Sequence, residues 1–246
     1  MITYNTFQEY RTLDDLINSL MLVDKLSQVP GGCYHTTIRH LDRLHALDGD
    51  IVECGVWKGG FCIFLSHIFP DSKIWVCDSF DGFQDPGKSK YAGYTNEFFT
   101  PWNGQDWVRI SLDKVKYNFE CYGLSDSMAN SRIKFVKGWV KDSLPTSGIE
   151  KISLLRIDVD AYSATREVLD ALYPKVVTGG MIIFDDTNIF QSVDAIKDYY
   201  RDNNIPLKLY HPENDSLLLN METKSPDWSP IHENYQYPTG CYTIKQ

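Results

Sequence analysis

Short apolar runs alternate with segments of helical spacing along most of this chain. The apolar runs are rich in Val, Ile, Leu and Phe, which predicts buried β-strands. They cover residues 50–54, 73–77, 133–136, 151–157, 180–184, 207–210 and 240–245, and helical patterns lie at 61–69, 111–122, 163–173 and 193–201. Strands that alternate with helices are typical of a parallel sheet. We therefore expect an α/β fold with one doubly wound, mostly parallel sheet of about seven strands.

Three regions depart from this alternation. Apolar residues at helical spacing within 12–26 and 34–47 predict two helices before the first strand, so residues 1–48 form an N-terminal helical segment. Residues 84–123 begin with an irregular, aromatic stretch that is typical of a lid insertion. Residues 211–239 read as a long connection before the last strand. With 246 residues, we expect the chain 1–246 to form a single domain.

Composition and charge narrow the possible partners. The formal net charge is −9 and the sequence contains no Lys/Arg run, which argues against binding to nucleic acid or to an anionic membrane surface. The apolar runs are too short for a membrane helix, and the N-terminus lacks the pattern of a leader peptide. The six cysteines include no C-x-x-C pair and are expected to be reduced. These features predict a cytoplasmic protein.

A glycine loop follows the first predicted strand. The sequence Glu53-x-Gly55-x-x-x-Gly59 places glycines where the backbone turns tightly before a helix. Asp78 ends the next strand, about twenty residues on, where α/β nucleotide binders place the acid that accepts hydrogen bonds from ribose hydroxyls. The G-x-x-x-G spacing suits a carboxylate and an amine better than a pyrophosphate. It therefore favours S-adenosylmethionine over NAD.

Carboxylates follow two further strands. Asp158 and Asp160 come after strand 151–157, and Asp185 and Asp186 come after strand 180–184. Ligands of open α/β sheets bind beyond these strand ends, and clustered acids without a His or Cys suit Mg²⁺ or Mn²⁺. The basic residue beside them is Arg156, which alternation points to the side opposite Ile157. Acids after strands are also common as helix caps or turn residues, and that alternative stays open.

Together these segments carry a family resemblance. The residues are Gly49-Asp-Ile-Val-Glu-Cys-Gly-Val-Trp-Lys-Gly-Gly60, Val76-Cys-Asp-Ser-Phe-Asp-Gly-Phe83, Gly138-Trp-Val-Lys-Asp-Ser-Leu-Pro145, Leu155-Arg-Ile-Asp-Val-Asp-Ala-Tyr162 and the stretch 171–186. In order and separation, over roughly residues 12–205, they resemble the macrocin O-methyltransferase (TylF/MycF/NovP-like) family. The resemblance implies the Rossmann-like fold of class I S-adenosylmethionine-dependent methyltransferases.

The resemblance also implies an activity and the residues that carry it. It implies transfer of a methyl group from S-adenosylmethionine to a hydroxyl of a sugar or glycosylated small molecule, with Mg²⁺ (or Mn²⁺), usually in a homo-oligomer. The implied metal ligands are Asp158, Asp185 and Asp186, and the implied catalytic residues are Asp160, as general base, and Asp158. The implied cofactor contacts are Glu53, Gly55, Val56, Trp57, Gly59, Asp78, Ser79, Gly138, Trp139 and Asp158.

Two other functions remain open at this point. Asp158-Val-Asp160 is a D-x-D, the metal and nucleotide-sugar motif of many glycosyltransferases. A binding protein that holds S-adenosylmethionine without catalysis is the second alternative. A thermal-shift panel separates them: stabilisation by adenosylhomocysteine indicates the methyltransferase, and stabilisation by a UDP-sugar with Mn²⁺ indicates the glycosyltransferase. If Asp160 is not the base, His211 and His232 are the alternatives.

Overall fold

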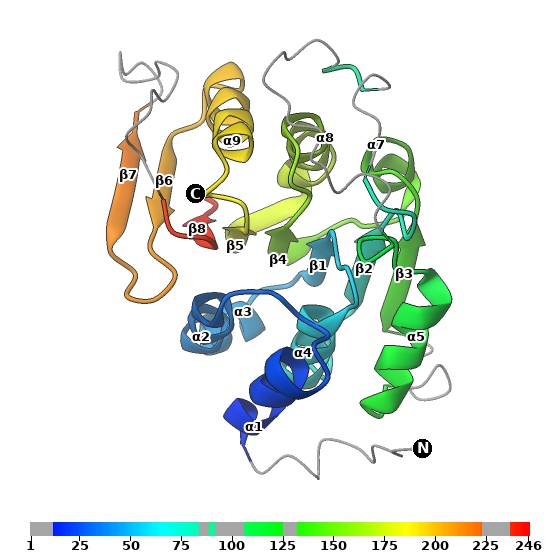
Figure 1. Cartoon of the computed structure of the whole chain (residues 1–246). Coiled ribbons are helices and arrows are strands. Elements are labelled where there is room, and N and C mark those ends of the chain that lie inside the picture. Colours follow the sequence, from blue (N-terminus) through cyan, green and yellow to red (C-terminus); the bar gives the residue numbers. More distant parts are fainter. Residues whose placement is uncertain (1–11, 84–88, 92–105, 125–131, 223–236) are drawn as a thin grey trace.

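The computed structural model describes residues 12–83, 89–91, 106–124, 132–222 and 237–246. One eight-stranded sheet runs through this part of the chain, in the order β3-β2-β1-β4-β5-β8-β6-β7 (Figure 1). Strands β1 to β5 are parallel, and β8, β6 and β7 extend the sheet with antiparallel pairings. The strands are β1 Asp50–Cys54, β2 Ile74–Asp78, β3 Ile133–Lys137, β4 Ile152–Ile157, β5 Val176–Phe184, β6 Leu207–Tyr210, β7 Leu217–Met221 and β8 Cys241–Ile244.

Helices cover both faces of this sheet. The α-helices are α1 Leu13–Asn18, α2 Gly31–Arg39, α3 Leu41–His45, α4 Gly60–Ile68, α5 Leu112–Cys121, α7 Val140–Ser143, α8 Tyr162–Leu172 and α9 Phe190–Asp202. A π-helical segment, η2 Ser19–Val23, extends α1, and 3-10 turns η4 Leu144–Thr146 and η5 Tyr173–Lys175 follow α7 and α8. The helices α1 to α4 lie on one side of the sheet, and α7, α8 and α9 lie on the other (Figure 1).

The hydrophobic core is divided by the sheet into two clusters. Side chains alternate along β1, so Ile51 joins the cluster that contains α1, α4 and α5, while Val52 joins the cluster that contains α8 and α9. Strand β4 is buried along its whole length, as the apolar run in the sequence predicts. The predicted doubly wound α/β fold is therefore confirmed.

The strand count differs from the prediction of about seven strands. The additional strand is β7, which lies inside the connection predicted over residues 211–239. It pairs only with β6 at the edge of the sheet, and Leu217 at its start is 51% exposed. Three successive leucines, residues 217–219, mark this strand within the segment that was expected to be a connection.

Two local boundaries also differ from the sequence-based expectation. The strand expected over residues 180–184 begins earlier, because β5 starts at Val176 and includes residues 178–180. Gly179 has a φ of +84°, and the pairing register with β4 shifts nearby, so the glycines bend the strand without ending it. The helix expected within 34–47 begins at Gly31 and is divided at His40 into α2 and α3.

The predicted lid insertion, residues 84–123, is only partly covered, because 84–88 and 92–105 lie outside the described residues. Within the described part, α5 is a core helix, since Val115 and Phe119 are buried. Residues 89–91 contact α8, where the Ser89 hydroxyl donates to Glu167 and the Tyr91 hydroxyl donates to Asp170, each at 2.5 Å. The insertion is therefore anchored to the helix that follows Asp160.

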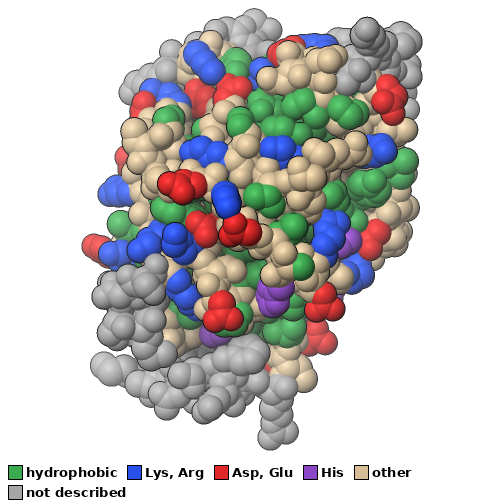
Figure 2. Space-filling view, turned by 180° about the vertical axis from the view of Figure 1, so that it is seen from behind, with side chains coloured by type: hydrophobic (Ala, Val, Ile, Leu, Met, Phe, Trp, Pro, Cys, Tyr) green, Lys and Arg blue, Asp and Glu red, His purple; other side chains and the backbone are tan. Residues whose placement is uncertain are grey.

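The described surface carries charges of both signs (Figure 2). On the back of the molecule, basic and acidic side chains are interspersed over the described part of the face (Figure 2). This pattern does not provide the continuous basic surface that a nucleic-acid backbone requires. In the described ranges, no helix combines the length and the apolar character that crossing a membrane requires.

Candidate active site

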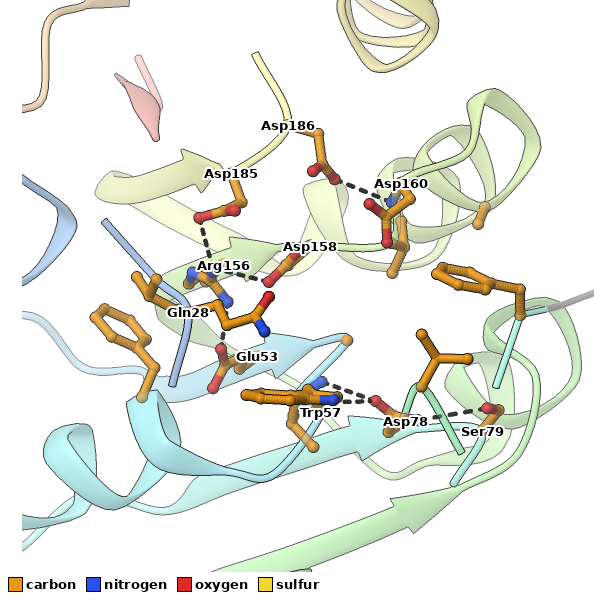
Figure 3. Close-up of a pocket in the computed structure, with 18 of the residues that line it drawn as sticks. Gln28, Glu53, Trp57, Asp78, Ser79, Arg156, Asp158, Asp160, Asp185 and Asp186 are labelled. Atoms are coloured by element: carbon orange, nitrogen blue, oxygen red, sulfur yellow. Dashed lines mark hydrogen bonds and ion pairs between the residues drawn. The ribbon is translucent and has the colours of Figure 1, made fainter. Parts of the chain in front are cut away.

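A cavity of about 420 Å³ opens at the carboxyl ends of β1, β2, β4 and β5 (Figure 3). Its volume falls in the range of small-molecule sites. Most of the residues predicted to bind a cofactor or metal line it, namely Glu53, Gly55, Val56, Trp57, Asp78, Ser79, Trp139, Asp158, Asp160, Asp185 and Asp186. Parallel strands bring these residues together because their carboxyl ends share one edge of the sheet.

Gly55 fixes the close approach of the glycine loop to the end of β4. Its φ is +82°, and a Cβ at this position would lie 1.6 Å from the backbone oxygen of Asp158. The backbone N–H of Asp158 donates in turn to the carbonyl of Cys54 at 2.9 Å. Only glycine allows this contact, because any side chain would separate the two strand ends.

Asp78 caps the glycine loop. One carboxylate oxygen accepts hydrogen bonds from the backbone N–H groups of Val56, at 2.8 Å, and Trp57, at 3.3 Å, and the other accepts from Phe80 at 2.7 Å. Burial raises the pKa of Asp78, and these backbone donors oppose the rise. Asp78 therefore shapes the loop as well as facing the cavity, and its predicted contact with a ribose remains a prediction.

Gly59 and Gly138, two of the predicted cofactor contacts, do not line the cavity. Gly59 has a φ of +84° and directly precedes α4, where a Cβ would lie 2.8 Å from Phe119. Gly138 has a φ of +139°, and its N–H donates to the carbonyl of Asp78 at 3.0 Å. Both glycines act on the backbone that supports the cavity, because each occupies a conformation that other residues rarely adopt.

Arg156 lies between the carboxylates at the base of the cavity (Figure 3). Its guanidinium, 1% exposed, forms ion pairs with Glu53, with Asp158 at 2.9 Å and with Asp185 at 2.5 Å. Strand alternation predicts Arg156 beside the acids and on the side opposite Ile157, and the ion pairs agree with that position. Residues two apart in a strand share a face, so Arg156 and Asp158 point the same way. The guanidinium of Arg156 thus neutralises part of the negative charge of these carboxylates.

A second group of carboxylates surrounds Asp160. Ligand atoms of Asp158, Asp160 and Asp186 all lie within 4.8 Å of one another. The backbone N–H of Asp160 donates to Asp186 at 2.9 Å, and Asp160 has a φ of +59°, an unusual backbone conformation for a residue other than glycine. Asp185, predicted as a metal ligand, lies outside this group and pairs with Arg156.

The electrostatics of this group favour a cation. Burial, followed by repulsion from Asp185, raises the pKa of Asp158 well above its usual range and that of Asp160 to about 6. Burial and the charge of Asp160 likewise raise the pKa of Asp186. Carboxylates that resist ionisation together are stabilised in their charged form by a divalent ion. Three oxygen donors at this spacing fit a hard cation such as Mg²⁺ or Mn²⁺ after small side-chain movements.

Several lining residues were not predicted from the sequence. Leu26, Ser27, Gln28 and Val29 come from the segment between η2 and α2, and Trp107 and Val108 come from the described part of the insertion. The indole N–H of Trp57 donates to the carbonyl of Trp107 at 2.8 Å, which joins the glycine loop to the insertion. No local motif marks these residues, because they reach the cavity only through tertiary packing.

The sequence of this chain is similar to those of known O-methyltransferases. The sequence model of the family described as macrocin O-methyltransferase (TylF) matches residues 35–217. Demethyldecarbamoylnovobiocin O-methyltransferase from Streptomyces niveus is 39% identical over 158 residues, which cover 62% of this chain and 58% of the relative. Mycinamicin III 3''-O-methyltransferase from Micromonospora griseorubida is 36% identical over 156 residues, which cover 61% of this chain and 60% of the relative. The match thus spans about three fifths of the length of these curated relatives.

The fold comparison agrees. The solved structure of the O-methyltransferase NovP is similar with a TM-score of 0.67 and 29% sequence identity, covering 85% of this chain and 98% of that one. The cavity lies at the point where the strand order reverses, between the parallel neighbours β1 and β4. The Rossmann-like class I methyltransferase fold that the resemblance implied is thereby confirmed.

Proposed function

Because this chain belongs to the macrocin O-methyltransferase (TylF) family, we propose that it transfers a methyl group from S-adenosylmethionine to a hydroxyl of a sugar or glycosylated small molecule, with Mg²⁺ (or Mn²⁺) as the metal. The name of another relative supports a glycosylated acceptor: it is the 8-demethyl-8-(2,3-dimethoxy-alpha-L-rhamnosyl)-tetracenomycin-C 4'-O-methyltransferase from Streptomyces olivaceus, which is 36% identical over 156 residues. The family match favours this function over the D-x-D glycosyltransferase. We further propose that the active form is a homo-oligomer and that the acceptor is a small molecule.

One observation carries the proposal. A single cavity joins a glycine loop capped by Asp78 to a group of three carboxylates, Asp158, Asp160 and Asp186. A methyltransferase needs both parts in one space, because the methyl donor and the acceptor oxygen must meet in line. We assign the glycine loop, Asp78, Ser79 and Trp139 to the cofactor and the carboxylate group to the acceptor side.

The residues of the chain suggest the following division of work. When bound, S-adenosylmethionine supplies an electrophilic methyl group and Mg²⁺ supplies positive charge that favours ionisation of a hydroxyl. Asp158 and Asp186 would hold the metal, with Asp185 as a further carboxylate nearby. Asp160 would accept the proton of the acceptor hydroxyl, because its carboxylate lies in the same group as Asp158 and Asp186, the proposed metal ligands. The indole of Trp57 would exclude water from the cavity.

The overall test is an acceptor screen with radiolabelled S-adenosylmethionine and Mg²⁺. We expect label to appear on a sugar hydroxyl of a glycoside, and we expect unglycosylated aglycones to remain unlabelled. Stabilisation of the protein by a UDP-sugar with Mn²⁺, without stabilisation by adenosylhomocysteine, would instead support the glycosyltransferase.

Cofactor binding should depend on Asp78. Replacing Asp78 with alanine is expected to weaken adenosylhomocysteine binding by roughly 1.5–3 kcal/mol, because a charged hydrogen-bond acceptor is lost and the loop at Val56 and Trp57 loses its cap. Isothermal calorimetry measures this change. Asp81→Ala removes an exposed carboxylate three residues away and is the matched control. Unchanged affinity in a folded Asp78→Ala protein would contradict the assignment.

Turnover should depend on a divalent cation. Excess EDTA is expected to abolish methyl transfer and added Mg²⁺ to restore it, because the carboxylate group would otherwise carry uncompensated charge beside the reacting oxygen. Adenosylhomocysteine binding, measured in parallel, should persist in EDTA, since the cofactor contacts proposed above do not include the metal. Full activity in excess EDTA would remove the metal from the mechanism.

A further inference from the structure

Gln28 is an exposed side chain on an otherwise buried segment of the cavity wall. Its neighbours Leu26, Ser27 and Val29 are between 6% and 8% exposed, whereas Gln28 itself is exposed. Its side chain extends into the cavity and lies, in the view of Figure 3, between Asp158 and Glu53. Among the described residues it forms no hydrogen bond, so its amide is available to a ligand.

The segment that carries Gln28 is held firmly against the glycine loop. The backbone N–H of Gly60 donates to the carbonyl of Leu26 at 3.1 Å, and a Cβ on Gly60 would lie 2.6 Å from that oxygen. The hydroxyl of Tyr34 donates to Ser27 at 2.7 Å, and the backbone N–H of Val29 donates to the same oxygen at 3.1 Å. The backbone on both sides of Gln28 is therefore held in place, which positions the start of its side chain at the cavity wall.

The charges at this end of the cavity define what Gln28 can bind. Glu53, Asp158 and Asp185 surround Arg156, whose two terminal nitrogens donate to these carboxylates. A ligand ammonium group finds acceptors here, but a ligand carboxylate meets repulsion unless a donor approaches from another side. The amide of Gln28 provides two N–H donors without adding charge.

From these contacts we propose that Gln28 binds the α-carboxylate of the methionine part of S-adenosylmethionine. The inference rests on the proposed function, in which Asp78 and Ser79 bind the cofactor and Asp78 is the expected ribose contact. In Figure 3, Trp57 separates Asp78 and Ser79 from Glu53 and Gln28, so a cofactor that spans the cavity has its amino-acid end beside Gln28. Gln28 is thus a cofactor-binding residue supplied by the segment before α2, outside the sheet and its glycine loop.

The test compares two ligands that differ in the amino-acid part. Adenosylhomocysteine carries the α-carboxylate, whereas 5'-methylthioadenosine lacks the whole amino-acid group. Gln28→Ala is expected to weaken adenosylhomocysteine binding about 10- to 100-fold, the scale of a hydrogen bond to a charged group, and to leave methylthioadenosine affinity within about twofold. Gln28→Glu should weaken adenosylhomocysteine further, because it places a carboxylate beside the ligand's own.

Controls separate this inference from the proposed function. Asn18→Ala replaces an exposed amide on α1 outside the cavity and should change neither affinity, and melting temperatures should show that all variants are folded. If the wild-type protein binds neither ligand, the proposed cofactor is wrong. If it binds both and Gln28→Ala affects the two equally or not at all, Gln28 does not bind the carboxylate. If Gln28→Glu binds adenosylhomocysteine more tightly than the wild-type protein, residue 28 lies beside the α-ammonium group of the ligand, and the inference is also overturned.

Discussion

Replacing Asp160 with asparagine is expected to slow methyl transfer roughly 10²- to 10⁴-fold, the usual range for loss of a general base. The substitution keeps the shape of the side chain and removes its ability to accept a proton at neutral pH. The backbone N–H of Asp160, which donates to Asp186, is unchanged, so the local backbone should persist. Single-turnover kinetics at saturating Mg²⁺ and cofactor measure the chemical step directly.

A comparison with Asp158 distinguishes a base from a metal ligand. Asp158→Asn should lower metal affinity, so high Mg²⁺ should recover part of its activity, whereas Asp160→Asn should not be rescued. If Asp160→Asn methylates normally once the metal is saturating, Asp160 is an outer ligand or a helix cap. The search for the base would then turn to His211, which accepts a hydrogen bond from the backbone of Glu213, and to His232, which lies outside the described residues.

Replacing Arg156 with methionine is expected to lower the free energy of unfolding by about 3–5 kcal/mol at pH 7. Arg156 is 1% exposed and is the ion-pair partner of Glu53, Asp158 and Asp185, so its loss leaves three carboxylates without their cation. Chemical denaturation monitored by circular dichroism measures the difference. The ion pair between the exposed Arg201 and the half-buried Asp198 supplies the control, because Arg201→Met should cost less than about 1 kcal/mol.

The stability loss in Arg156→Met should depend on pH in a definite direction. Burial already raises the folded-state pKa of Glu53 and Asp158, and removing the guanidinium raises both further above their values in the unfolded chain. Groups with a raised folded pKa stabilise the protein at low pH and lose that contribution as pH rises. The variant should therefore recover part of its stability from pH 7 to pH 5. Adding Glu53→Gln to Arg156→Met should also recover part of the lost free energy of unfolding at pH 7. A double variant no more stable than Arg156→Met alone would argue against uncompensated charge as the cause.

The sequence predicts the structure correctly where the local apolar pattern identifies a buried strand. The buried runs 151–157 and 180–184 predict β4 and most of β5 correctly, because a strand covered on both faces is predominantly apolar. The same runs locate Asp158 and Asp186 at one sheet edge, since parallel strands end together. Where burial is slight, as in β7, or where a glycine bends a strand without ending it, as at Gly179, the prediction was wrong.

The sequence by itself determined the α/β class, the glycine loop, the acids beyond the strands and the family resemblance, because each depends on local pattern or on spacing between neighbouring motifs. Only the tertiary structure decided how these parts are connected. In the tertiary structure Arg156 pairs with three carboxylates, and Asp160 lies beside Asp158 and Asp186. Asp78 accepts hydrogen bonds from the glycine loop, and Gln28 lines the cavity. The physical reason is that ion pairs and cavity walls are formed by side chains that are far apart in the sequence. Hydrophobic periodicity indicates secondary structure and burial, but it does not indicate which distant side chains come into contact.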